Sequence, residues 1–214
     1  MKISFAVTTH NEGECIQDLL SQLAEFIEGN ETDDEIVILD DYSDDTETVN
    51  ILEEYENLPY VHLHRRELER DFGAHKSYLN SLCSGDYIFQ IDADETLAPQ
   101  LLENLHTILE TNTEVDMLLV PRVNTVTGLT DAHIQQWGWS VNEMGWVMWP
   151  DWQTRIYRNN SEIMWLGRVH ERIVGHEKFA YLPADEAYAI YHHKDIKRQE
   201  AQNAMYSEIV TGSE

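Results

Sequence analysis

The feature that most constrains this chain is an alternation of short apolar runs with amphipathic stretches over its first 120 residues. Apolar runs at residues 3–7, 35–39, 61–64, 87–89 and 115–120 predict strands. Between them, apolar residues recur at helical spacing over residues 16–27, 46–55, 72–82 and 101–109, which predicts helices. Such alternation indicates an α/β fold with a mostly parallel central sheet and helices on both faces.

The composition favours one sizeable folded domain. The chain has 214 residues, of which 42% are hydrophobic, enough for a proper core. No stretch approaches the ~20 apolar residues of a membrane span, so no membrane span is expected. Met1 leads directly into the first strand, which argues against a signal peptide. Cys15 and Cys83 lie in ordinary helical surroundings, and a reduced, cytoplasmic protein is the simplest interpretation.

The net charge of −26 disfavours simple adhesion to nucleic acid or anionic lipid, because both bind basic surfaces. The basic residues are few and clustered, with eight of the 14 lying within residues 155–198. This clustering fits an anionic ligand, and it equally fits ion pairs with neighbouring carboxylates. Both interpretations stay open here.

Polar, largely acidic turns follow three of the predicted strands, at residues 8–12, 40–45 and 92–95. In a parallel sheet these turns meet at one edge, where open α/β sheets bind their ligands. The last turn contains Asp92 and Asp94 in a D-x-D pattern. Carboxylates are hard oxygen ligands that suit Mg²⁺ or Mn²⁺ carrying phosphate groups. A D-x-D pattern alone is equally typical of a solvated turn, and the convergence of three turns favours a binding site.

The residues of these turns resemble glycosyltransferase family 2, whose nucleotide-sugar-binding fold is called GT-A. The similar segments are T-T-H-N-E at 8–12, I-L-D-D-Y-S-D-D at 38–45, G-A-H-K-S-Y-L-N at 73–80 and G-D-Y-I-F-Q-I-D-A-D-E at 85–95. Residues 150–158 and 167–171 resemble the branch with lipopolysaccharide-core β-glucosyltransferases, and small versions are typical of tailed phages. A phage origin would make the host cytoplasm the location.

The resemblance covers residues 3 to about 193 and implies a single GT-A domain over residues 1–194. Residues 1–120 would be its nucleotide-sugar-binding half and residues 121–194 its acceptor and catalytic half. Residues 195–214 would form a C-terminal helix. Oligomeric state is left open.

The resemblance assigns the nucleotide to residues near the first two turns. Asp41, in preference to Asp40, would accept hydrogen bonds from the base, with Thr8 and Asn11 lining its pocket. Lys76 would approach the nucleotide or its diphosphate as a point charge. A UDP-sugar is the expected donor.

The resemblance also implies a Mn²⁺ or Mg²⁺ site. Asp92 would contact the ribose or the metal, and Asp94 would coordinate the metal directly. His170 resembles the C-terminal histidine that completes the metal shell in this fold, with His192 and His193 as alternatives.

The implied reaction is inverting transfer of the sugar to an acceptor hydroxyl, with Asp151 as general base. Pro150 departs from the family pattern, which has glutamate there. A structural role for Asp151, paired with Arg155, is the alternative, and Glu171 and Glu143 are the next candidates for the base.

All six tryptophans lie within residues 137–165. Aromatic rings stack on sugars and on bases, although most tryptophans belong to a core. We expect residues 137–152 to cover the acceptor side, and part of this segment to become ordered only when donor binds.

Other functions fit parts of the pattern. A non-catalytic nucleotide-sugar binding module would keep the three turns but lack a base. A nucleotidyltransferase would normally have a glycine-rich, basic loop after the first strand, which residues 8–13 lack. The acceptor could be a saccharide or a hydroxymethylated DNA base, since flipped bases also stack on aromatic rings. The net charge of −26 argues against DNA.

Overall fold

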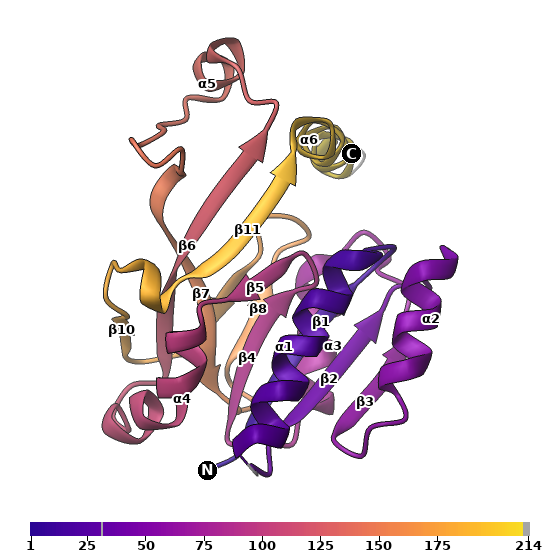
Figure 1. Ribbon diagram of the computed structural model, residues 1–214, viewed down its shortest axis with the longest axis vertical. Helices are drawn as coiled ribbons and strands as arrows, with labels where there is room; N and C mark the ends of the chain where they lie inside the picture. The colour runs from indigo at the N-terminus through magenta and orange to yellow at the C-terminus, as the bar shows by residue number, and fades with distance from the viewer. Residues whose placement is uncertain (31, 212–214) are drawn as a thin grey trace.

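One mixed sheet organises residues 1–30 and 32–211, the part of the chain that the computed structural model describes. Its strand order is β3-β2-β1-β4-β7-β6-β11-β5, with β10 added beside β6, and β8 and β9 form a separate pair. Helices lie on both faces of the sheet (Figure 1). The expected α/β fold with a doubly covered sheet is confirmed.

The strands and helices have the following bounds. The strands are β1 (Ile3–Thr9), β2 (Glu35–Asp40), β3 (Val61–Arg65), β4 (Tyr87–Asp92), β5 (Glu95–Leu97), β6 (Met117–Thr127), β7 (Val147–Arg158), β8 (Met164–Leu166), β9 (Arg172–Val174), β10 (Phe179–Tyr181) and β11 (Ile190–Asp195). The helices are α1 (Glu14–Asn30), α2 (Thr46–Tyr55), α3 (Phe72–Leu82), α4 (Pro99–Thr111), α5 (Asp131–Trp137), the 3₁₀ turn η1 (Glu186–Tyr188) and α6 (Ile196–Thr211).

Parallel pairing of the first strands brings the three polar turns together, as expected. β1 lies between β2 and β4 and is parallel to both. In this register Thr9 is beside Asp40, and Thr8 is beside Asp92. The carboxyl ends of three strands therefore meet at one edge of the sheet.

The second half of the chain adds antiparallel pairing. β7 runs antiparallel to both β4 and β6 and lies between them. The strand expected at residues 115–120 continues through Pro121 to Thr127. Register irregularities lie on both sides of Pro121, which is how a sheet accommodates a residue without an N–H donor. Asp151 lies inside β7, opposite Arg122 of β6.

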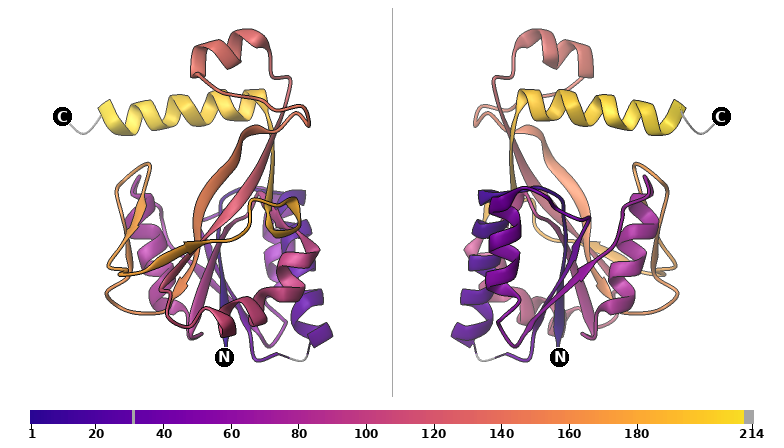
Figure 2. Two further views of the ribbon diagram at one scale, coloured as in Figure 1. Left: turned by 90° about the vertical axis from the view of Figure 1, so that its left-hand side faces the viewer. Right: turned by 90° about the vertical axis from the view of Figure 1, so that its right-hand side faces the viewer.

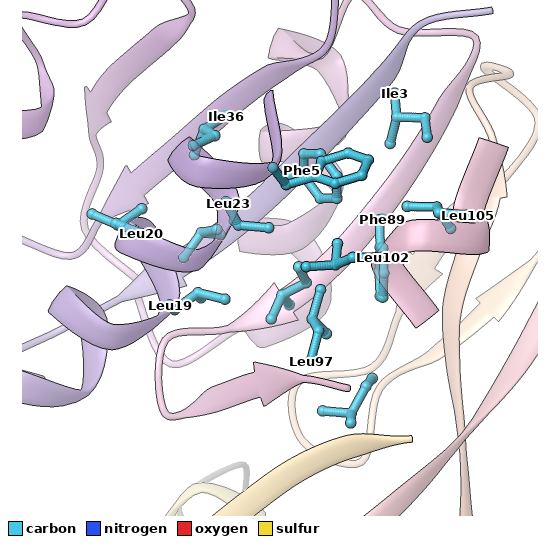
Figure 3. Close-up of a cluster of buried hydrophobic side chains, with 14 of the residues drawn as sticks. Ile3, Phe5, Leu19, Leu20, Leu23, Ile36, Phe89, Leu97, Leu102 and Leu105 are labelled. Atoms are coloured by element: carbon cyan, nitrogen blue, oxygen red, sulfur yellow. The ribbon is translucent and has the colours of Figure 1, made fainter. Parts of the chain in front are cut away.

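Two apolar layers hold the helices on the sheet. One contains Phe5 and Phe89 from the strands with Leu19, Leu23 and other leucines from α1 and α4 (Figure 3). These residues are buried because α1 and α4 carry apolar residues at helical spacing on one face. The other layer, on the α3 side, includes Leu79, Ile88, Tyr157 and Trp165.

Trp165 belongs to this second layer and is a buried core residue. Its indole Nε1 donates to the Tyr157 hydroxyl at 2.9 Å, and that hydroxyl donates to Asn80 Oδ1 at 2.9 Å. The buried polar atoms of both rings are thereby satisfied.

A hydrogen-bond network around Glu35 connects three chain segments at the amino edge of the sheet. The buried Glu35 carboxylate accepts from Lys2 Nζ, from Ser4 Oγ and from the Ser84 backbone N–H, each at 2.6 Å. Burial raises the pKa of Glu35, but these donors outweigh burial and lower it to about 2. Gly85 packs so closely here that a Cβ atom would lie 2.7 Å from the Ser4 nitrogen.

Helix α6 lies across the opposite, carboxyl edge of the sheet, and α5 projects beyond it (Figure 2). The helix was expected over residues 195–214; it begins at Ile196 and is described to Thr211, while residues 212–214 lie outside the described part. Only Ile209 of α6 is buried. None of the described helices is long and apolar enough to cross a membrane.

Candidate functional site

A cavity of about 600 Å³ opens at the carboxyl edge of the sheet, beneath α6. The ends of β1 and β4, the N-terminal part of α3, and the strands β6, β7 and β11 line it. Seven of the site residues predicted from the sequence reach this one cavity: Thr8, Asp41, Lys76, Asp92, Asp94, Asp151 and His170.

Asp41 lies at the end of the cavity next to β1 and β2. Its Oδ1 accepts from the Leu68 backbone N–H at 2.8 Å, and the ring of His10 is 3.9 Å from its other oxygen. The carboxylate is part-buried and lines the cavity together with Thr8. It is thus oriented and still open to a ligand.

Asp40 and Asn11 are engaged in the turns themselves. Asp40 is buried, and its Oδ1 accepts from both the backbone and the hydroxyl of Ser43. The Asn11 side chain accepts from the backbone N–H groups of Asp44 and Asp45 and donates to the Asp44 carboxylate. Both residues hold the first two turns together, and neither is among the cavity-lining residues.

Asp92 faces two cations. Its Oδ2 accepts from Arg155 Nη2 at 2.7 Å, and its Oδ1 lies 3.2 Å from Lys76 Nζ. Burial raises the pKa of Asp92, but Arg155 and Lys76 hold it well below its ordinary value. Lys76 also pairs with Glu171 at 2.9 Å and lies over the Trp165 ring. Asp92 is therefore ionised and already neutralised by protein side chains.

Glu95 links this carboxylate to the other end of the cavity. Its fully buried side chain accepts from Arg155 at 2.6 Å and from Arg122 at 3.0 Å through the same oxygen, while its other oxygen accepts from the Asp92 backbone N–H. Arg122 in turn pairs with Asp151 at 2.7 Å. An unbroken chain of ion pairs thus runs from Asp92 to Asp151.

Asp151 is fixed by donors from two strands. Its Oδ2 accepts from Arg122 Nε and Nη2 and from Asn124 Nδ2 at 3.0, 2.7 and 2.8 Å, and its Oδ1 accepts from Gln153 at 2.9 Å. Burial raises the pKa of Asp151, but Arg122 and the other donors lower it below its ordinary value. The alternative pairing with Arg155 is not the one found; Arg155 pairs with Asp92 and Glu95 instead.

The hydrogen bonds of Asn124 show that Nδ1 of His192 carries a hydrogen. Asn124 Nδ2 donates to the Asp151 carboxylate, so the amide oxygen of Asn124 faces His192 Nδ1, at 2.9 Å. Because that oxygen only accepts, Nδ1 must carry a hydrogen. His192 Nε2 then faces Asp94 Oδ2 at 3.2 Å either as a second N–H donor or as a free lone pair beside a carboxylate.

This pair fits a divalent cation in part. With the imidazole neutral, Nε2 and Asp94 Oδ2 are two neighbouring ligand atoms that a divalent cation can share. Asn124 supplies the outer hydrogen bond that orients a ligating histidine. Within residues 1–30 and 32–211, no three His, Cys, Asp or Glu side chains are grouped so as to hold a metal ion by themselves. A metal here would therefore take its other ligands from phosphate or water, as Mg²⁺ commonly does.

The other two histidines considered as metal ligands lie elsewhere. The ring of His170 lines the cavity and contacts the edge of Tyr206, with ring centroids 5.5 Å apart. The exposed ring of His193 bonds to the hydroxyls of Thr125 and Thr127. The histidine that contacts Asp94 is His192, which the sequence offered only as an alternative.

Arg198 of α6 covers the same carboxylate. Its Nη2 lies 3.1 Å from Asp94 Oδ2 and donates to Glu12 Oε1 at 2.7 Å. His192 and Lys194 both favour the ionised carboxylate, and although burial raises the pKa of Asp94, the net effect lowers it to about 2. α6 is thereby attached to the end of β1 and to the D-x-D turn.

The aromatic segment reaches the cavity through a few residues. Trp139, Val147 and Met148 line it. Trp139 packs against Trp137, with ring centroids 4.7 Å apart, and Trp146 packs against Trp149 at 4.9 Å. Trp152 faces away from the cavity and packs on Tyr181. Of the tryptophans in residues 137–152, Trp139 is therefore the one that lines the cavity; the buried Trp165, from β8, also lines it.

Sequence reasoning missed Glu12, Glu95, Arg122, Arg155 and Arg198 as residues of this site. Glu12 and Glu95 lie within the turns that were singled out, so their positions were available. The cluster of basic residues within 155–198 includes Arg155 and Arg198, but the clustering did not single out either one as a residue of the site. Their partners lie 60 or more positions away along the chain, which no local pattern reveals.

A comparison with family models matches residues 4–174 to Glycosyl transferase family 2. Among curated proteins, the chain is similar to poly(ribitol-phosphate) beta-N-acetylglucosaminyltransferase TarP of Staphylococcus aureus (strain N315). The two are 28% identical over 109 residues, which are 49% of this chain and 32% of TarP.

Among solved structures, the chain is similar to residues 1–349 of S. aureus TarS, with a TM-score of 0.62 and 20% identity over 90% of this chain and 60% of that one. The same TarS region in complex with UDP gives a TM-score of 0.64 at 20% identity, over 90% and 60% of the two chains. Its complex with UDP-GlcNAc gives 0.62 at 22% identity, over 91% and 59%. These similarities confirm a GT-A-like fold, and the chain spans about a third of TarP and three fifths of the TarS region.

Proposed function

The chain belongs to glycosyl transferase family 2, and from this premise we propose that it transfers a sugar from a nucleotide-diphosphate donor to an acceptor hydroxyl. The observation that carries the proposal is a single cavity that joins Asp41, the Asp92–Asp94 turn and Asp151. A UDP-sugar is the proposed donor, supported by the similarity to TarS in complex with UDP and with UDP-GlcNAc.

The nucleotide end of the donor would lie against Asp41 and Thr8. Asp41 keeps one carboxylate oxygen free of backbone donors, which suits it to accept from the N–H groups of a base. Lys76 and Arg198 lie on either side of the D-x-D turn, where cations can compensate the charge of a diphosphate.

Asp94 and His192 are the residues that we propose to hold a Mn²⁺ or Mg²⁺ ion, with Asn124 orienting the histidine. The chemistry that such an ion supplies when bound is Lewis-acid neutralisation of the diphosphate leaving group. Asp94 was already expected from the sequence as a metal ligand. His192 replaces His170 as the proposed histidine ligand. Asp92 would act on the ribose side or as a further oxygen ligand.

Asp151 is the proposed general base of an inverting transfer. Its carboxylate would take the proton of the acceptor hydroxyl while that oxygen attacks C1 of the sugar from the face opposite the diphosphate. Arg122 and Asn124 fix the orientation of the carboxylate, as precise positioning requires. Membership in the branch with lipopolysaccharide-core glucosyltransferases, drawn from residues 150–158 and 167–171, remains part of this proposal.

Calorimetric titration of UDP into the full chain tests the donor site. We expect Mn²⁺ to raise the affinity of the wild type for UDP by roughly tenfold or more, and Asp94→Ala to remove this increase. Asp41→Ala should weaken binding of uridine even without metal. Asp86→Ala, which changes an exposed carboxylate at the amino edge, is the control. Equal UDP affinity with and without Mn²⁺ in wild type and Asp94→Ala would end the metal assignment.

A further inference from the structure

The charges that line the cavity are nearly balanced before any ligand binds. Among the described residues, five basic side chains and six carboxylates line it. Four of the basic side chains form ion pairs with carboxylates: Lys76, Arg122, Arg155 and Arg198. The fifth, Lys194, is buried and donates to Gln202 at 2.7 Å.

A nucleotide-diphosphate donor adds negative charge to this balance. The cations near the D-x-D turn, Lys76 and Arg198, are those best placed to compensate a diphosphate. Arg122 and Arg155 are held deeper, by the buried Glu95. With the donor bound, Lys76 and Arg198 would serve the diphosphate, Arg122 and Arg155 would stay paired with Glu95, and Lys194 would stay hydrogen-bonded to Gln202.

The cation beside Asp151 is Arg122, and it is already paired with Asp151 and with the buried Glu95. Residues 123–154 contain no lysine or arginine, and they include Asp131, Glu143 and Asp151. In this stretch α5 and the following chain project beyond the ends of β6 and β11 (Figure 1). Apart from Asp151, its cavity-lining side chains are uncharged: Asn124, Thr125, Val126, Trp139, Val147, Met148, Gln153 and Thr154.

From these observations we propose that Trp139, Met148 and Gln153 form an acceptor subsite for an uncharged saccharide. The inference rests on the proposed function and names the class of its acceptor. An indole offers the flat apolar face that sugar rings cover, and Gln153 offers amide groups to their hydroxyls. A phosphate-bearing acceptor would meet the negative charge of Asp151, whose partner Arg122 is already shared with the buried Glu95.

The transfer needs no reactant other than the donor and the acceptor. The acceptor oxygen forms a bond to C1 of the donor sugar, and the bond from C1 to the diphosphate oxygen breaks. The hydroxyl proton passes to Asp151, and the nucleoside diphosphate leaves with the electron pair of the broken bond. The acceptor saccharide, which would bind on the Trp139 side, brings only an uncharged hydroxyl group to the reaction.

An acceptor panel tests the proposal. The full chain would be incubated with Mn²⁺ and, in turn, UDP-GlcNAc, UDP-glucose and UDP-galactose. The acceptors would be cellopentaose, maltopentaose, poly(ribitol phosphate) and duplex DNA with 5-hydroxymethylcytosine. UDP release without acceptor and UDP binding would be measured in parallel. We expect transfer to a neutral oligosaccharide at a rate at least about tenfold above that to either polyanion.

The outcomes separate the two proposals. Preferred transfer to poly(ribitol phosphate) or to DNA, at a rate that falls as salt rises, overturns the uncharged acceptor and leaves the transferase standing. UDP release that neither neutral oligosaccharide accelerates also counts against the subsite. Absence of both UDP binding and UDP release from every donor would instead refute the proposed function.

Variants locate the subsite. Trp139→Ala should raise the KM for the neutral acceptor by roughly tenfold or more, the effect of losing one stacking surface, with UDP affinity and acceptor-free UDP release unchanged. Trp139→Phe should restore most of the loss, which a folding defect would not allow. Tyr181→Ala, an exposed aromatic residue outside the cavity, should leave the KM unchanged. An unchanged KM in Trp139→Ala would remove this indole from acceptor binding.

Discussion

At the scale of single residues, the two oxygens of Asp151 differ in how many donors they face. Oδ2 accepts three hydrogen bonds, from Arg122 and Asn124, whereas Oδ1 accepts one from Gln153. Oδ1 therefore keeps capacity for an acceptor hydroxyl. We expect Asp151→Asn to lower turnover by ~10²–10⁴ while UDP affinity stays near that of the wild type. Turnover assays and calorimetry measure the two quantities.

The matched control for this variant is Asp116→Asn. Asp116 is likewise a hydrogen-bonded carboxylate, accepting from the backbone N–H groups of Glu177 and Lys178, but it lies outside the cavity. It should turn over like the wild type. If Asp151→Asn kept most of its turnover, the base would have to be sought elsewhere, first at Glu171 and then at Glu143.

The same carboxylate sets an expected pH dependence. A base must be ionised, and Asp151 has a pKa below its ordinary value of 3.8 despite the opposing effect of burial, chiefly because of Arg122. Protonation of Asp151 should therefore lower the wild-type rate only as pH falls below 3.8. Arg122→Gln removes the attraction to the charged form, so the pKa rises and the loss of rate moves to higher pH. Profiles of kcat against pH measure the shift.

Arg158→Gln serves as the comparison, because Arg158 ends the same strand but pairs with Asp116 outside the cavity. Its acid limb should coincide with that of the wild type. An acid limb in Arg122→Gln that matches the wild type would separate Arg122 from the ionisation of the base.

Residues next to a strand end could be predicted from the sequence, whereas residues that depend on pairing between distant segments could not. Asp41, Asp92 and Asp94 are close to β-strand ends, so a local pattern locates them. Glu95 and Arg155 become neighbours only because β7 inserts beside β4. Nothing local in the sequence encodes that insertion.

At the scale of elements, the first five predicted strands were found because each is a short apolar run between turn residues. β7 differs: residues 147–158 mix aromatic, proline and charged residues, and most of them are only partly buried. The period-2 alternation that identifies a half-buried strand is therefore missing. Its place in the sheet follows from long-range pairing with β4 and β6.

Helix α6 depends on a few polar contacts for its position. Only Ile209 is buried, while Arg198 binds Glu12 and lies beside Asp94, and Tyr206 packs against Phe72. Exposed ion pairs contribute ~0.2–1 kcal/mol each. We therefore expect Arg198→Ala to speed amide hydrogen exchange in α6 by roughly two- to fivefold. Hydrogen exchange with mass spectrometry resolves this helix.

Lys197→Ala removes the neighbouring exposed cation and should leave exchange in α6 close to that of the wild type. Equal protection of α6 in Arg198→Ala and the wild type would mean that the packing of Tyr206 and Ile209 holds the helix without the ion pairs.

At the scale of the whole molecule, the amino edge of the sheet makes stability depend on acid. The pKa of Glu35 is lowered from 4.5 to about 2, so its contribution is fully present above pH 4.5 and is lost as pH falls toward 2. The buried carboxylate contributes on the order of 3 kcal/mol to the free energy of unfolding. Urea unfolding between pH 7 and pH 2 measures this contribution.

We expect Glu35→Gln to be less stable than the wild type at pH 7, and the difference to shrink as pH falls from 4.5 to 2. Glu103→Gln, an exposed change on α4, should track the wild type throughout. A difference between Glu35→Gln and the wild type that stayed constant over this range would mean that the ionisation of Glu35 is not the source.

The ion pairs at the carboxyl edge have a further consequence for selectivity. Lys76 and Arg198 are each shared between two carboxylates, Asp92 and Glu171 for the lysine and Glu12 and Asp94 for the arginine. An anion can pair with Lys76 or Arg198 only if that side chain breaks an ion pair with a carboxylate. Anion binding here therefore replaces one ion pair by another. We expect inorganic phosphate to bind poorly in such a cavity, even at concentrations that fill an unpaired basic site. Each phosphate would leave a buried carboxylate without a partner, and only a ligand with many other contacts can compensate that loss.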